Sequence, residues 1–201
     1  MGQVQNLFSK WYYHGEVKRH EDIKSMLTYQ LTTANLKQPD EWNCTVRSSF
    51  DSDTNKDDFS WDLFNNYISD NLMDMHVQLG GRVTTSIKMS EAWINVYHQG
   101  DSQEVHTHCG GDNTAFSCAY FMQYDPEEDG RFMFYDPNQD MHHGHFTKHY
   151  PATNTWFPEV KEGDIVIFPS YLHHQVTPQG DNPQARITVS ANFTLHSDIN
   201  L

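Results

Sequence analysis

The sequence predicts a mostly β protein, an antiparallel jelly-roll barrel with helices at its N-terminal end. From residue 84 onward, short runs rich in β-branched and aromatic residues alternate with turn residues. Before that point, two stretches carry apolar residues at steps of three and four, the spacing of a helical face. Because no long helical pattern interrupts the strands, we expect the helices to pack on one sheet of the barrel.

The two helices are expected within residues 17–36 and 58–79. Asp58 and Ser60 are candidate N-caps of the second helix, because their side-chain oxygens can accept hydrogen bonds from its first N–H groups. Gly80 directly follows the last apolar residue, which indicates the end of that helix.

The barrel is expected to contain about eight strands, separated by turns rich in glycine, aspartate and proline. These strands are expected over residues 92–98, 104–109, 115–124, 131–135, 155–157, 164–169, 173–178 and 185–195. The chain is long enough for a single domain with a sizeable core. We expect a helical and loop region over residues 1–83 that packs on a β core over residues 84–201.

Composition argues against several classes of partner. Lys and Arg number 13 against 27 Asp and Glu, a formal charge of -14, so neither nucleic acid nor an anionic membrane is an expected partner. Three cysteines without a CxxC motif favour a reducing, cytoplasmic setting over a disulfide scaffold. We expect no signal peptide and no membrane span, because no apolar run approaches the roughly 20 residues that a span needs.

The histidines suggest a metal site. His106 and His108 stand two residues apart, so on a strand they face the same side, although a surface His-x-His pair would look the same. In a barrel, the second and seventh strands can lie side by side, and the seventh carries His173 and His174. Neighbours on a strand face opposite sides, so only one of these can join the pair, and periodicity does not choose. Three imidazoles would form a facial site with open positions, with Asp112 as a reserve ligand.

An arginine begins the last expected strand. Alternation puts one set of residues of this strand on a polar face: Arg186, Thr188, Ser190 and Asn192. The other set is apolar and must face the core: Ile187, Val189, Ala191 and Phe193. If the polar face lies inside the barrel, the planar guanidinium can bind a carboxylate through two hydrogen bonds, with the Thr188 hydroxyl adding a third. The alternative is an arginine on a solvated outer face. Asn95 and Tyr120 are further candidates to reach a ligand.

Several motifs together resemble a known family. They are Trp93-Ile94-Asn95, His106-x-His108, Ser117-x-x-Tyr120-Phe121, Phe168-Pro169-Ser170-Tyr171-Leu172-x-His174 and Arg186-x-Thr188. In order and spacing, over roughly residues 90–195, they resemble the 2-oxoglutarate- and Fe(II)-dependent oxygenases of the prolyl-4-hydroxylase-like group, which is common in phages and marine bacteria. The resemblance implies a double-stranded β-helix fold and Fe(II), 2-oxoglutarate and O2 as cofactors. For a phage-encoded member it implies the host cytoplasm.

The resemblance also assigns roles to residues. It selects His174 over His173 as the distal ligand, and it implies that Arg186 and Thr188 hold the far carboxylate of 2-oxoglutarate. The sequence departs from the superfamily pattern at His108, where most members carry Asp or Glu.

The expected function is that of a 2-oxoglutarate-dependent Fe(II) dioxygenase that hydroxylates a protein or peptide side chain or a small molecule. The alternative is a non-oxidative, cupin-like metal-binding enzyme or binding protein on the same barrel. Arg186 with its hydroxyl partner distinguishes the two, because a simple metal site does not need it. The sequence does not indicate an oligomeric state.

Overall fold

The computed structural model describes residues 3, 10–50, 58–109, 113–137, 149 and 153–197. Within these residues the helices are α1 (His20–Leu31) and α2 (Trp61–Gln78). The strands are β1 (Tyr13–Glu16), β2 (Arg47–Ser48), β3 (Thr85–Tyr97), β4 (Gln103–His106), β5 (Thr114–Gln123), β6 (Phe132–Tyr135), β7 (Thr155–Trp156), β8 (Asp164–Pro169), β9 (His173–Val176) and β10 (Arg186–Ser197).

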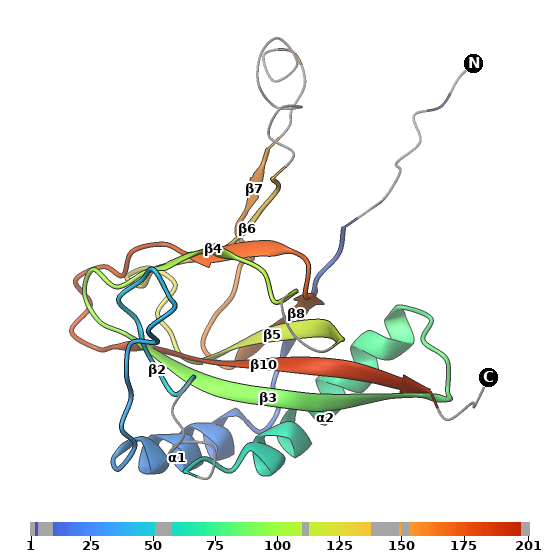
Figure 1. Cartoon of the computed structure of the whole chain (residues 1–201), viewed down its shortest axis with the longest axis horizontal. Coiled ribbons are helices and arrows are strands. Elements are labelled where there is room, and N and C mark those ends of the chain that lie inside the picture. Colours follow the sequence, from blue (N-terminus) through green and yellow to red (C-terminus); the bar gives the residue numbers. More distant parts are fainter. Residues whose placement is uncertain are drawn as a thin grey trace.

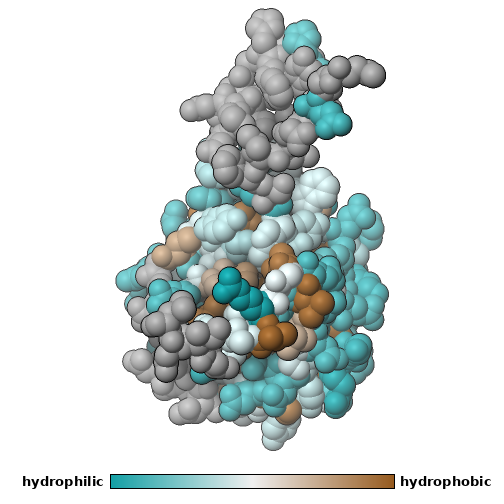
Figure 2. Space-filling model, turned by 90° about the vertical axis from the view of Figure 1, so that its right-hand side faces the viewer, coloured by the Kyte–Doolittle hydropathy of each residue, from teal (hydrophilic) through white to brown (hydrophobic). Residues whose placement is uncertain are grey.

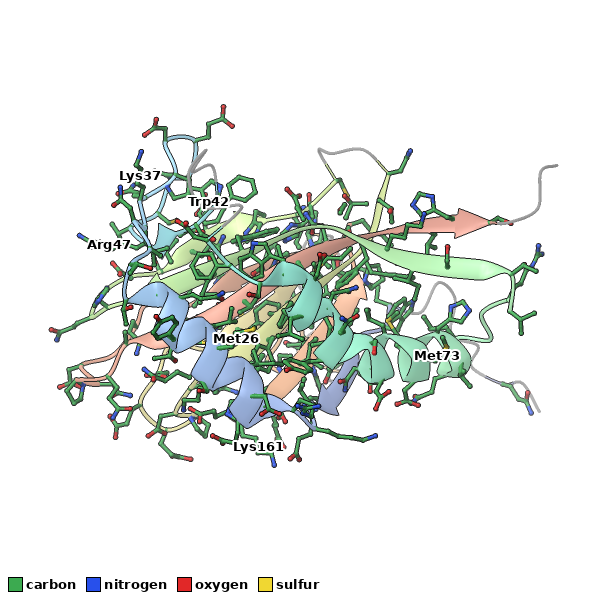
Figure 3. The ribbon with its side chains drawn as sticks, turned by 90° about the horizontal axis from the view of Figure 1, so that it is seen from below. Met26, Lys37, Trp42, Arg47, Met73 and Lys161 are labelled. Atoms are coloured by element: carbon green, nitrogen blue, oxygen red, sulfur yellow. The ribbon has the colours of Figure 1, made fainter. Side chains whose placement is uncertain are left out.

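The strands form two antiparallel sheets that face each other (Figure 1). The large sheet has the order β1-β8-β5-β10-β3-β2, and the small sheet has the order β4-β9-β6-β7. Both helices lie on the outer face of the large sheet (Figure 3). The predicted jelly-roll barrel with N-terminal helices is therefore confirmed.

Two hydrophobic cores result from this layering. The outer core lies between the helices and the large sheet, and there Leu27 and Phe64 pack with Val189 and Phe193. The inner core lies between the two sheets and includes Phe121, Phe132, Phe134, Phe168 and Val176. Each fully buried side chain of this size contributes roughly 1.5–3 kcal/mol to stability. The apolar residues of β10 face the outer core, as predicted, so the polar residues of that strand face the small sheet.

The second helix begins and ends close to the expected residues. Ser60 occupies the N-cap position of α2, but its hydroxyl makes no capping hydrogen bond. It accepts a hydrogen bond of 2.8 Å from Gln30 Nε2, which ties the start of α2 to α1. Gly80 follows the helix with a φ of 69°, a left-handed conformation that glycine adopts without a steric penalty.

The N-terminal region also supplies two strands that the sequence did not predict. β1 pairs with β8 and β2 pairs with β3, so they form the two edges of the large sheet. The expected boundary at residue 83 falls in the turn between α2 and β3. Neither helix of the described residues is long and apolar enough to cross a membrane.

One end of the barrel extends beyond the small sheet. There the first half of β3 and the second half of β10 run together past β4 and β9 (Figure 1). Figure 2 looks onto this end, where apolar side chains gather near the centre among polar ones. Among the large apolar side chains exposed on these two strands and the turn before them are Val83 and Leu195.

Candidate metal centre

Three predicted histidines meet between the sheets. β4 pairs with β9 so that His106 lies directly opposite His174. His108 follows the end of β4, and its backbone N–H donates to the Ser170 carbonyl at 2.9 Å. One ligand nitrogen from each imidazole lies within 4.8 Å of the others. The structure thus brings together side chains from two strands that are distant in sequence.

Backbone carbonyls orient two of these rings. His106 Nδ1 donates to the Glu104 carbonyl at 2.8 Å, and His174 Nδ1 donates to the Leu172 carbonyl at 2.9 Å. A carbonyl only accepts, so each Nδ1 carries the proton and each Nε2 keeps its lone pair for a metal. Such outer hydrogen bonds are what fix the tautomer of a metal-binding histidine.

Burial keeps the imidazoles neutral. It lowers the pKa of His106, lowers the pKa of His108 to about 3, and holds the pKa of His174 well below its usual range. Mutual repulsion between the protonated rings adds to the effect at His108 and His174. At neutral pH all three rings are therefore in the form that a metal requires.

Spacing and chemistry fit a transition-metal ion. His108 Nε2 and His174 Nε2 are 3.1 Å apart. Two nitrogens that each bind one ion at roughly 2.1 Å and at right angles would lie roughly 3 Å apart. Imidazole suits iron, nickel, copper and zinc. The donor set therefore fits a divalent ion of this kind.

The structure separates the two adjacent histidines. The His174 residue is 4% exposed and its ring lies 4.2 Å from that of His106, centroid to centroid. His173 is half-buried and lines a separate cleft on the outer side of β9, beside Tyr12 and Trp156. Asp112, the reserve ligand, lies outside the described residues.

A buried arginine faces the same interior. Arg186 is 1% exposed, and its Nε and Nη1 have no hydrogen-bond partner among the described residues. Its Cζ lies 4.6 Å from the ring centre of Tyr97, 5.7 Å from that of Phe121 and 5.6 Å from that of Tyr124. These rings offset part of the cost of burying the charge. Among the described residues no carboxylate pairs with Arg186, and a buried cation without a counter-ion costs several kcal/mol, so this position favours an anionic ligand.

Tyr97 is a site residue that the sequence reasoning missed. Its hydroxyl donates to Gln103 Oε1 at 2.9 Å and lies beside Arg186 and Thr188. Burial raises the pKa of Tyr97 to about 12, so the hydroxyl stays a neutral donor. The signal was present, because Trp93, Asn95 and Tyr97 alternate along one strand and share a face.

The other two candidate binding residues lie in different places. Asn95 is 1% exposed on the inner face of β3, opposite Thr188, and its Nδ2 donates to Ser190 Oγ at 3.2 Å. Tyr120 lies on the outer face of β5, where its ring packs on Phe64 of α2. The structure therefore does not bring Tyr120 to the histidines, and we leave it out of the site.

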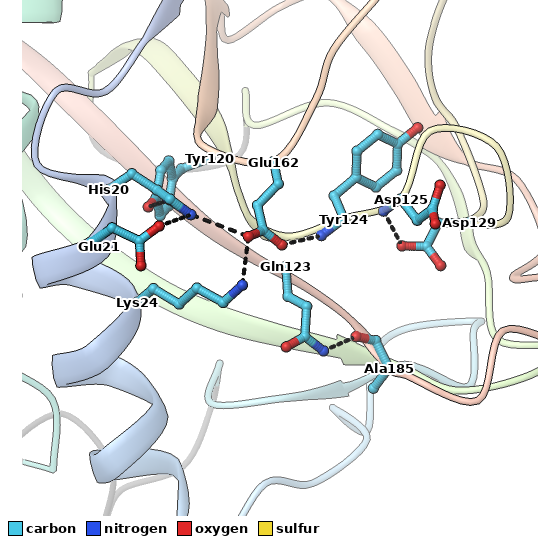
Figure 4. Close-up of polar contacts among 10 residues, drawn as sticks. All are labelled: His20, Glu21, Lys24, Tyr120, Gln123, Tyr124, Asp125, Asp129, Glu162 and Ala185. Carbon is cyan, nitrogen blue, oxygen red and sulfur yellow. Dashed lines mark hydrogen bonds and ion pairs between the residues drawn. The ribbon is translucent and has the colours of Figure 1, made fainter.

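Tyr120 belongs instead to a polar network that fixes α1 to the barrel (Figure 4). Its hydroxyl lies 2.6 Å from His20 Nδ1, and His20 Nε2 lies 3.3 Å from Glu162 Oε1. Lys24 binds the same carboxylate, whose other oxygen accepts from the Tyr124 backbone N–H.

The space between Arg186 and the histidines is narrow. A partly enclosed cavity of about 20 Å³ is lined by all three histidines together with Arg186, Thr188 and Ser190. A water molecule needs roughly 10–15 Å³ by this measure, so the cavity holds about one water. A ligand that reaches Arg186 from the histidines therefore requires lining side chains to move.

A jelly-roll barrel with three convergent imidazoles and a buried guanidinium, two of whose nitrogens have no hydrogen-bond partner among the described residues, fits a metal-dependent enzyme with an anionic co-substrate. Residues 91–192 match the family model described as "Putative 2OG-Fe(II) oxygenase". The chain belongs to this family of 2-oxoglutarate- and Fe(II)-dependent oxygenases. It is an enzyme whose reaction uses Fe(II), 2-oxoglutarate and O2. Among curated proteins, none matches the sequence.

Solved structures with the same fold include two prolyl hydroxylases and HygX. A prolyl-4-hydroxylase from Pseudomonas putida is 12% identical, with a TM-score of 0.61 over 92% of this chain and 93% of that one. A prolyl hydroxylase from Trichoplax adhaerens, in complex with a hypoxia inducible factor peptide, is 9% identical, with a TM-score of 0.61 over 91% and 83%. HygX from Streptomyces hygroscopicus, with nickel, 2-oxoglutarate and hygromycin B bound, is 10% identical, with a TM-score of 0.59 over 92% and 83%. At these identities the likeness establishes the fold.

Proposed function

We propose that His106, His108 and His174 hold Fe(II), and that Arg186 and Thr188 bind the distal carboxylate of 2-oxoglutarate. The enzyme then hydroxylates a protein or peptide side chain or a small molecule. One observation carries the proposal: a buried cation that has no counter-ion in the described part of the chain lines the same cavity as three neutral imidazoles. A non-oxidative metal site on this barrel would have no use for that guanidinium.

The side chains around the cavity have different roles in the proposed reaction. Bound iron and 2-oxoglutarate would supply the oxidising chemistry: O2 would give one oxygen atom to the substrate and the other to the succinate that forms as 2-oxoglutarate loses CO2. Arg186 offers a planar pair of donors that fixes the direction of the co-substrate. The neutral Tyr97 hydroxyl and the Thr188 hydroxyl lie beside that anchor and can add hydrogen bonds. Phe132 and Phe168 line the cavity and limit the entry of water.

The test is the formation of succinate from 2-oxoglutarate under air, with and without added Fe(II). Even without a substrate, we expect succinate to form slowly. This reaction should require Fe(II) and should stop under nitrogen. Zinc in place of iron is the matched control, because it can occupy imidazole ligands but has no redox chemistry. Absence of both succinate formation and 2-oxoglutarate binding in the iron-loaded protein would contradict the proposed function.

Replacing His108 tests the three-histidine assignment. We expect His108→Ala to lower iron affinity by more than the roughly 10–100-fold that loss of an outer hydrogen-bond partner costs, because a direct ligand is removed. His108→Asp should keep iron, since a carboxylate is the common third ligand of two-histidine iron sites. The measurement is an anaerobic Fe(II) titration of the three proteins. If His108→Ala binds iron as tightly as the unaltered chain, His108 is not a ligand.

A further inference from the structure

A row of hydrogen bonds crosses the inner face of the large sheet and ends at an exposed carboxylate. Ser170 Oγ and Ser117 Oγ are 3.0 Å apart, and Ser117 Oγ donates to Asn192 Oδ1 at 2.7 Å. Asn192 Nδ2 then donates to Glu91 Oε1 at 2.6 Å. Ser170, Ser117 and Asn192 are all buried, whereas Glu91 is exposed. The network therefore holds in one place a side chain that would otherwise sample many rotamers.

This network adjoins the metal centre. The carbonyl of Ser170 accepts the backbone N–H of His108 at 2.9 Å. Trp93 is two residues from Glu91 and shares its face of β3, and its ring centre lies 5.6 Å from that of His108. One end of the network, Ser170, thus bonds the backbone of His108, and the other end, Glu91, is close to Trp93, which contacts the His108 ring.

Within the part of the chain that the structure describes, Glu91 lies on the open side of the histidines, away from Arg186. Trp93 pairs with Ser190, which places the His108 ring over the middle of β10. Along β10, Arg186 lies on one side of this midpoint and Asn192, which pairs with Glu91, lies on the other. The six residues between Arg186 and Asn192 correspond to roughly 20 Å of strand. The Arg186 end is closed, whereas the Glu91 end is the part of the sheet that extends past β4 and β9 (Figure 1). A substrate that approaches from solvent meets Glu91 before it meets the histidines.

Aromatic rings and unpaired polar atoms accompany the carboxylate. The Phe50 ring lies 5.1 Å from that of Trp93, and the Trp42 ring lies 5.2 Å from that of Phe50, so aromatic contacts lead from His108 to the partly buried Trp42. Trp93 Nε1 and Asn95 Oδ1 are buried on this inner face without a hydrogen-bond partner among the described residues. A buried polar atom without a partner costs about 1–3 kcal/mol, so both atoms favour a polar ligand.

From this arrangement we propose that the substrate carries an ammonium or guanidinium group, which binds Glu91 and the face of Trp93 or Phe50 at the mouth of the barrel. A carboxylate combined with aromatic faces is the chemistry that recognises a cation. The formal charge of -14 attracts such a substrate at long range. Asn192 is a positioning residue that holds the carboxylate. The inference rests on the proposed function and names the substrate class of the same site.

The test uses the protein loaded with Fe(II) and 2-oxoglutarate under nitrogen, where ligands bind but do not react. Titration calorimetry compares hexapeptides that contain lysine or arginine with the same peptides containing norleucine or citrulline, which have similar shapes but no charge. Free lysine and arginine are titrated as well, to distinguish a small-molecule substrate from a peptide. We expect a cationic probe to bind about tenfold or more tightly than its neutral match, as the loss of a charged hydrogen bond implies.

Glu91→Gln should abolish this preference. Glutamine keeps an oxygen that can accept from Asn192, so the network is retained while the charge is lost. Glu127→Gln, which removes an exposed carboxylate from the turn between β5 and β6, is the matched control and should bind every probe normally. Lys88, which pairs with Thr194, lies farther out on the same face of β3. Lys88→Gln therefore tests whether this positive charge, and not the carboxylate of Glu91, determines which probes bind.

Three results would overturn the inference: equal binding of cationic and neutral probes, a preference that survives in Glu91→Gln, or an affinity that changes only in Lys88→Gln. Succinate formation without a probe is measured on the same unaltered protein under air. If it proceeds while no probe is preferred, the cationic-substrate inference is wrong and the proposed function stands. If it is absent together with 2-oxoglutarate binding, the proposed function itself fails.

Discussion

His174→Ala should abolish Fe(II) binding, whereas His173→Ala should leave it nearly intact. The two residues are neighbours on β9, but only His174 points into the cluster, where its Nε2 lies 3.1 Å from that of His108. Removing one of the three ligands leaves two neutral nitrogens, whereas a facial iron site uses three protein ligands to hold the ion. The measurement is iron content and anaerobic Fe(II) affinity after purification under nitrogen.

His173→Ala is also the control for folding, because it alters the same short strand. Circular dichroism of both variants should match that of the unaltered chain. Equal loss of iron in the two variants would mean that β9 itself is disturbed, and the assignment of His174 would lose its support.

Arg186→Met should have two opposite effects. The affinity for 2-oxoglutarate should fall by roughly 10–100-fold or more, because a charge-assisted pair of hydrogen bonds is lost. The free energy of unfolding of the cofactor-free protein should rise by about 1–4 kcal/mol, because a buried cation with no counter-ion among the described side chains is replaced by an apolar side chain of similar length. Co-substrate titration and urea unfolding measure the two quantities.

Arg186→Lys separates charge from geometry. Lysine keeps the charge but not the planar fork, so we expect intermediate 2-oxoglutarate affinity and no gain in stability. If Arg186→Met binds the co-substrate normally, the anion binds elsewhere. If its stability falls, the contacts of the guanidinium with Tyr97, Phe121 and Tyr124 already compensate its burial.

The parts of the site that follow a simple strand period could be predicted. His106 and His108 share a face because they are two residues apart, and the apolar alternation of β10 places Arg186 and Thr188 on the opposite, inner face. In β10 the residue types also reveal which side is buried, whereas in β4 they do not, because the apolar Val105 is exposed. The choice of His174 over His173 needed the family resemblance, because alternation alone treats the two equally.

Other parts depend on contacts that the sequence does not display. β1 has no apolar alternation and becomes a strand by pairing with the buried β8. In β5 the residues from Ser117 to Met122 are buried on both faces, so periodicity could not show that Tyr120 faces the helices. The network from Ser170 to Glu91 joins three strands and the turn after β8, and no local pattern marks it.

The pairing of β4 with β9 has a consequence for the survival of the protein in the cell. β4 has four residues and an irregular register, so this edge of the small sheet has few backbone hydrogen bonds of its own. An ion bound by His108 and His174 would cross-link positions 66 residues apart in the chain. By mass action, free metal at 100 times its dissociation constant would stabilise the folded chain by about 2.7 kcal/mol. Iron supply would then govern how much of the enzyme escapes proteolysis, in addition to how much of it is active.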